Sequence, residues 1–133
     1  MDRDAKIRMY AKMMARLVLI FGVVTVVIFT PFILYLHWSP IAMIALVTTI
    51  LGIILSGYAH IKSPDLPALN FRIWIAGTLL IVVGMSVADL DIRGISWRGL
   101  GGLALEWVVF GSAIVLNVIA VRKESSPDAI ASK

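Results

Sequence analysis

The stretch that decides the fold is residues 17–36, which read LVLIFGVVTVVIFTPFILYL and contain no charged side chain. A helix of this length rises about 30 Å, which matches the hydrocarbon core of a bilayer. The run is longer than the apolar region of a secretory signal, and no small-residue cleavage site follows it. We therefore expect residues 17–36 to form a transmembrane helix that bends near Pro31.

The composition of the whole chain agrees with a membrane environment. Of its 133 residues, 60% are hydrophobic and 15% are charged, whereas about 25% are charged in an average soluble domain. A chain this short cannot bury so much apolar surface in one water-soluble core. These values exclude a soluble globular domain, a disordered chain and a nucleic-acid-binding module. The absence of cysteine excludes disulfides and thiolate metal sites.

Three further apolar runs are long enough to span a membrane, at about residues 41–59, 72–90 and 100–121. The connection before the second run is short, so the first two spans must form an antiparallel hairpin. Prolines interrupt the polar segment 60–72 and separate the second span from the third. The sequence thus predicts an all-α, four-helix antiparallel transmembrane bundle. A polar, flexible tail is expected at residues 122–133.

Residues 1–16 precede the first span and carry five basic side chains. At 100° per residue, the apolar side chains fall on one face of a helix and the basic side chains on the opposite face. This predicts a basic amphipathic helical extension. It could simply continue the first span, or it could lie on an anionic membrane surface. The apolar face holds Ile7, Tyr10, Ala11 and Met14, and the basic face holds Arg8, Lys12 and Arg16.

The basic residues are distributed unequally between the two sides of the predicted bundle. One side holds the two ends of the sequence and residues 60–72, and ten of the twelve basic residues fall there. Only Arg93 and Arg98 fall on the other side. Because basic loops stay in the cytoplasm, we expect a cell-membrane protein with cytoplasmic N- and C-termini.

Small residues mark the predicted contact faces between helices. Thr48, Gly52 and Ser56 recur every four residues along the second span, and such spacing lets another helix approach closely. Gly84 in the third span and Gly102 in the fourth are further helix-packing candidates.

Glu106 is the only acidic residue well inside a predicted span. A carboxyl at that depth is costly, so it is a candidate functional residue. It shares one helix face with small residues and with Asn117, which makes this face the expected protein-facing side. Asn117 lies about three turns from Glu106, too far for direct contact. We therefore regard Glu106 and Asn117 as two candidate intramembrane polar sites.

Three residues are candidate charge partners for Glu106, namely His37, Arg93 and Arg98. A paired Glu106 would be a structural, ionised group. An unpaired one could instead bind a proton, a cation or a substrate, or could be a protonated packing residue.

Other constellations give weaker indications of chemistry. Asp89 and Asp91 stand two residues apart, which is a weak metal pattern and more often a solvated helix end. His37 and His60 are expected on opposite sides of the membrane, so they cannot together hold a haem. The sequence contains no nucleophile motif or phosphate-binding loop. We expect no catalytic residues, no cofactor and no metal, and hence no enzyme.

These observations favour a non-catalytic accessory or structural subunit, or a scaffold, of a membrane complex. Its expected partners are the lipid bilayer and other membrane subunits or further copies of itself, and nucleic acid is excluded. The alternative is a small oligomeric transporter or channel that uses Glu106. The accessory role is preferred because the spans offer a single buried acidic residue.

Overall fold

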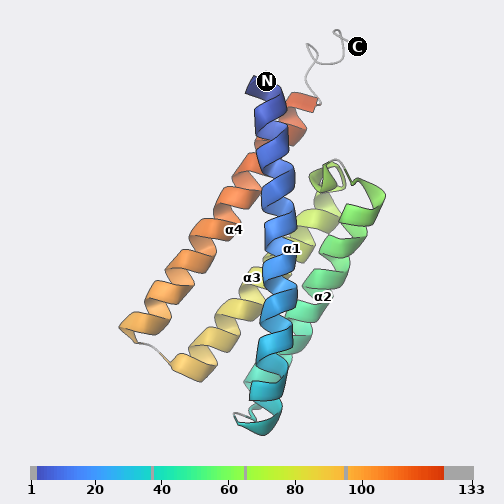
Figure 1. Cartoon of the computed structure of the whole chain (residues 1–133). Helices are drawn as coiled ribbons and strands as arrows, with labels where there is room; N and C mark the ends of the chain where they lie inside the picture. Colours follow the sequence, from blue (N-terminus) through green and yellow to red (C-terminus); the bar gives the residue numbers. More distant parts are fainter. Residues whose placement is uncertain (1–2, 37, 65, 95, 125–133) are drawn as a thin grey trace.

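A computed structural model describes residues 3–36, 38–64, 66–94 and 96–124. Within these residues the chain forms four long α-helices and one short 3-10 helix, η1 (Figure 1). All four α-helices are long and apolar enough to cross a membrane, which indicates a membrane protein. The predicted all-α, four-helix architecture is thus confirmed. The elements are α1 (Arg3–Tyr35), α2 (Pro40–Lys62), η1 (Pro67–Leu69), α3 (Phe71–Arg93) and α4 (Trp97–Glu124).

Successive helices run in opposite directions (Figure 1). The start of α1, the end of α4 and η1 lie at one end of the bundle, which we call the η1 end. The end of α1, the start of α2, the end of α3 and the start of α4 lie at the other end, which we call the loop end. The tightest pairing is between α2 and α3, and α1 packs mainly against α4.

Local sequence signals explain where the helices begin and end. Ser39 caps α2, since its Oγ accepts a 3.4 Å hydrogen bond from the Ala42 amide, and Pro40 occupies the first helical position. At the end of α3, Gly94 adopts φ +70°, a conformation that side chains with a Cβ rarely adopt. Its amide donates to the Leu90 carbonyl at 3.0 Å. The helices extend a few residues beyond the predicted spans at several ends.

The basic segment and the first span form one continuous helix, α1, which passes through Pro31. The segment therefore continues the first span, and its small apolar face packs on the bundle. The predicted tail begins inside α4, which runs to Glu124, and residues 125–133 lie outside the described part of the chain. The fully buried residues in the first half of α1 are Ala11, Ala15 and Val18.

The backbones of α2 and α3 are in direct contact along a line of small residues, which we call the α2–α3 seam. A Cβ added to Gly52 would lie 2.6 Å from the Gly77 carbonyl oxygen, and one added to Gly84 would overlap Thr49 Oγ1. No side chain fits at these glycines without moving a helix. The seam consists of Ala45, Thr49, Gly52 and Ser56 on α2 and of Gly77 and Gly84 on α3.

The seam departs from the predicted stripe at one position. Gly52 and Ser56 lie in it, but Thr48 is half-buried beside it and donates to the Ile44 carbonyl of its own helix at 2.8 Å. Thr49 takes the place expected for Thr48. A strict four-residue repeat turns 40° around the helix at each step, whereas alternating steps of four and three residues stay on one side. Two closely aligned helices therefore require the second spacing.

Candidate functional site

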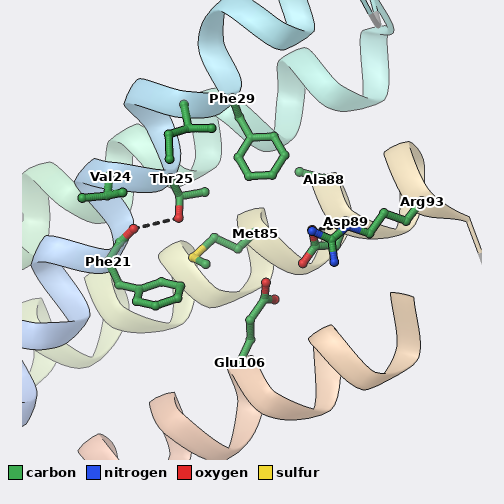
Figure 2. Close-up of a pocket in the computed structure, with 10 residues that line it drawn as sticks. Phe21, Val24, Thr25, Phe29, Met85, Ala88, Asp89, Arg93 and Glu106 are labelled. Atoms are coloured by element: carbon green, nitrogen blue, oxygen red, sulfur yellow. Dashed lines mark hydrogen bonds and ion pairs between the residues drawn. The ribbon is translucent and has the colours of Figure 1, made fainter. Parts of the chain in front are cut away.

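A pocket of about 280 Å³ lies between α1, α3 and α4, towards the loop end of the bundle (Figure 2). We call it the acidic pocket. Its polar side chains are Thr25 from α1, Asp89 and Arg93 from α3, and Glu106 from α4. The remaining lining is apolar and consists of Phe21, Val24, Ile28, Phe29, Met85 and Ala88.

Helix geometry brings the two carboxyls of the pocket together. In an α-helix each Cα–Cβ bond tilts toward the N-terminus of the helix. Because α3 and α4 are antiparallel, Asp89 tilts away from the loop end while Glu106 tilts toward it. Glu106 accordingly extends from α4 toward Met85 and Asp89 of α3 (Figure 2). Two residues at different depths in their own helices thus meet in one pocket.

Asp89 and Glu106 are direct neighbours in a largely apolar environment. Asp89 is only 6% exposed, and the Glu106 side chain is partly buried. Both carboxyls line the acidic pocket, and their charges interact. Glu106 Oε2 is buried and has no hydrogen-bond partner among the described residues. Two adjacent carboxyls can share one proton, and the unpartnered oxygen can accept a hydrogen bond from a further donor.

Arg93 is the positive charge nearest to the carboxyl pair. Its Nε lies 4.0 Å from Asp89 Oδ1, at the long limit of an ion pair, and half of its side chain is exposed. It also interacts with Glu106 through charge. Its Nη1 would lie 3.2 Å from a Cβ on Gly102, so the guanidinium rests against α4. One guanidinium thus faces two carboxyls, which leaves excess negative charge when both are ionised.

Asn117 lies on the same face of α4 as Glu106 but serves a different contact. Its Nδ2 donates to the Ala11 carbonyl of α1 at 3.1 Å and to the Ala113 carbonyl of its own helix at 2.7 Å. The helical rise places it about 16 Å from Glu106 along α4. Asn117 therefore joins α4 to α1 nearer the η1 end and does not line the acidic pocket.

The other sequence candidates do not contribute to this pocket. Arg98 is exposed and outside its lining, and His37 lies outside the described residues. His60 Nε2 lies 3.3 Å from the Ala15 carbonyl oxygen, so it joins α2 to α1. Asp91 lies about 200° around α3 from Asp89 and is absent from the pocket lining. The described residues contain no group of three or more potential metal ligands.

Asp89 is the site residue that the sequence pattern does not reveal, because its spacing with Asp91 predicts a solvated helix end, whereas the structure buries it. A signal was present in the pattern of α3. Thr78, Ile81, Val82 and Met85 follow helical spacing on the buried face, and Asp89 is the next member of that series. A carboxyl that continues a buried face is a stronger candidate than one that merely ends a helix.

Comparison of the chain with protein-family models, curated proteins and solved structures found no match. The chemistry of the site is therefore interpreted from its own geometry. That geometry comprises two carboxyls, one guanidinium and a surrounding apolar wall.

Proposed function

We propose that the protein moves a proton or a small cation across the membrane, as a transporter or channel, and that Asp89 and Glu106 bind the moving ion. The observation that carries the proposal is the position of Asp89 beside Glu106 in the acidic pocket. The sequence offered one buried acidic residue, and this favoured an accessory subunit. A second carboxyl facing the first supplies the group that an ion site needs.

The proposed chemistry is a competition for the same oxygens. A proton shared by Asp89 and Glu106 neutralises one carboxyl, and a bound cation replaces that proton when it leaves. Arg93 offsets one of the two negative charges, which lowers the cost of holding the other in an apolar environment. Exchange of a proton for a cation is thus the reaction that the pocket supports best.

We also propose an orientation in the cell membrane. Ten of the twelve basic residues belong to the ends of the sequence and to residues 60–72, which supports cytoplasmic N- and C-termini. The acidic pocket then lies nearer the outer side of the membrane, and an ion would reach it from that side over a shorter distance.

The experiment is ion flux through the purified full-length protein in liposomes that enclose a pH-sensitive dye. A potassium diffusion potential, negative inside, drives protons inward through a channel, and an outward sodium gradient drives them inward through a proton–cation exchanger. We expect the wild type to acidify the lumen, and Glu106→Gln or Asp89→Asn to fall to the rate of protein-free liposomes. Asp91→Asn is the matched control, because it makes the same change on α3 outside the pocket lining and should retain flux.

Two results would contradict the transport proposal. One is equal flux in the wild type and in folded Glu106→Gln and Asp89→Asn proteins, judged by circular dichroism and gel filtration. The other is the absence of lumen acidification in the wild type under either driving force.

A second candidate is the non-catalytic accessory subunit or scaffold, and one observation favours it. A shallow groove runs along the outer face of α4, and a Cβ on Gly111 would contact nothing within 4 Å there. Small residues on an uncovered face let a helix of another membrane subunit or of a second copy approach. The groove is lined by Trp107, Val108, Gly111, Ser112, Val115 and Leu116.

Purification in mild detergent tests this second candidate. A stoichiometric complex that dissociates in Gly111→Leu, but not in Gly57→Leu on α2, would support the accessory role. A small particle containing this chain alone, unchanged in mass by Gly111→Leu, would argue against it. Both candidate functions are non-catalytic, and the absence of enzymatic activity stays a prediction.

A further inference from the structure

The acidic pocket is larger than an inorganic ion requires. Its volume is about 280 Å³, whereas one water molecule occupies about 30 Å³ in the liquid. Pockets for small organic molecules begin at about 300 Å³. The volume therefore corresponds to a compact organic ligand, and the lining shows which kind.

We propose that the acidic pocket binds a small lipophilic organic cation, namely a protonated amine with an aromatic or alkyl body. This inference rests on the proposed function and names its substrate class. Three features of the pocket carry it: the polar end, the apolar wall and the position of the opening.

The polar end selects a cation that donates hydrogen bonds. Glu106 Oε2 is buried without a partner among the described residues, and an ammonium N–H would supply the missing donor. Asp89 adds a second carboxyl, while Arg93 neutralises only one. An anion would be repelled, because it would face both carboxyls. A divalent metal would find no third carboxylate, histidine or cysteine in the part of the chain that is described.

The wall selects an apolar body for that cation. Phe21 and Phe29 border the pocket, and aromatic faces attract organic cations as well as apolar groups. Thr25 is the polar residue of this wall, and its hydroxyl already donates to the Phe21 carbonyl at 2.7 Å (Figure 2). A ligand with a polar body would therefore lose hydrogen bonds to water that the wall does not replace.

The opening lies along α1 on the apolar surface of the bundle. Phe21, Val24 and Ile28 line the pocket and are also 46%, 49% and 62% exposed. These side chains thus connect the pocket to the surface that the bilayer covers. A lipophilic amine concentrates in the bilayer, so it can enter from the lipid as well as from water.

The experiment compares three probes that share one body and differ in charge. Binding of 4-phenylbutylamine, 4-phenylbutanol and 4-phenylbutyrate is measured by calorimetry on the full-length protein in lipid nanodiscs, with empty nanodiscs subtracted to remove partition into lipid. We expect the amine to bind about tenfold more tightly than the alcohol, the value of one charge-assisted hydrogen bond, and the carboxylate not to bind. Glu106→Gln should weaken amine binding by about the same factor, and Asp91→Asn should not.

A second variant tests the pocket without changing its charge. Val24→Trp adds bulk at the opening, and because Val24 is half exposed the helix itself should tolerate the change. We expect folded Val24→Trp to lose amine binding. Equal binding of amine and alcohol by the wild type would overturn the inference. Undiminished amine binding in Val24→Trp would overturn it as well.

The two proposals fail separately. Proton flux that requires Glu106, without specific amine binding, would overturn the substrate class and leave the proposed function standing. Specific amine binding without movement of any ion would overturn the proposed function and leave the pocket as a ligand site.

Discussion

Trp107 Nε1 donates a 2.9 Å hydrogen bond to Ser86 Oγ, and this bond joins α4 to α3 beside the acidic pocket. The Ser86 hydroxyl donates its own proton to the Val82 carbonyl at 2.7 Å, so it acts toward Trp107 as the acceptor. Glu106 precedes Trp107 by one residue, which is 100° around the helix. The bond therefore sets the rotation of α4 that directs Glu106 into the pocket.

Breaking this bond should destabilise the α3–α4 contact. Trp107→Phe and Ser86→Ala each remove one partner, and we expect a coupling energy of about 1 kcal/mol between them. The measurement is a double-mutant cycle on reversible unfolding in mixed micelles. Val108→Ala is a control for lost side-chain bulk at the exposed surface. Strictly additive effects would show that the two side chains do not interact.

The α2–α3 seam predicts a sharp contrast between two glycines of one helix. Gly52→Ala would place a methyl group 2.6 Å from the Gly77 carbonyl oxygen, so it should cost about 2 kcal/mol or more. Gly57→Ala places its methyl in open space and should be neutral or slightly stabilising. Thermal unfolding of the purified variants measures both. Similar melting temperatures for the two would mean that the seam is not a close backbone contact.

The bond from Asn117 to α1 predicts a local effect far from the pocket. Asn117→Leu keeps most of the volume but removes the hydrogen bond to the Ala11 carbonyl, at a cost of about 1 kcal/mol. Hydrogen exchange should then increase in α1 around Ala11. Ser112→Ala is the matched control, since that exposed hydroxyl donates to the Val108 carbonyl of its own helix. Unchanged protection of α1 in Asn117→Leu would contradict the role of this bond.

The charge asymmetry predicts the topology directly. A reporter that is active only in the cytoplasm should work when fused to the C-terminus or inserted in residues 60–72. The same reporter inserted at Gly94 should be silent. Activity at Gly94 together with silence at the C-terminus would reverse the proposed orientation.

The number and approximate bounds of the helices could be predicted because run length and hydrophobicity are local properties. Each span is long enough to cross the bilayer on its own. The connections contain residues that are typical of helix ends, such as Ser39 and Gly94. The observed helix ends lie a few residues beyond the predicted ones because polar residues can extend a helix once its backbone is already ordered.

The acidic pocket could not be predicted because it depends on how two helices face each other. The pattern of α4 indicates that Glu106 faces the protein, but it does not specify which residue of α3 lies opposite. That pairing depends on the height and rotation of α4, which Trp107, Ser86 and the tight turn at Gly94 determine together. The place of Thr49 in the seam could not be predicted for a similar reason, since the sequence of one helix does not show whether its partner crosses it or runs alongside.

The seam has a mechanical consequence for the whole bundle. Its two helices touch through their backbones, so they cannot slide or separate without losing contact along much of their length. Asn117 joins α1 to α4 nearer the η1 end, whereas around the pocket α1 presents mostly half-exposed side chains. The α2–α3 pair is therefore the rigid part of the bundle, and α1 is held against its neighbours at two points, at Ala11 near the η1 end and at Ile33, which packs on Ala42 and Leu46 near the loop end.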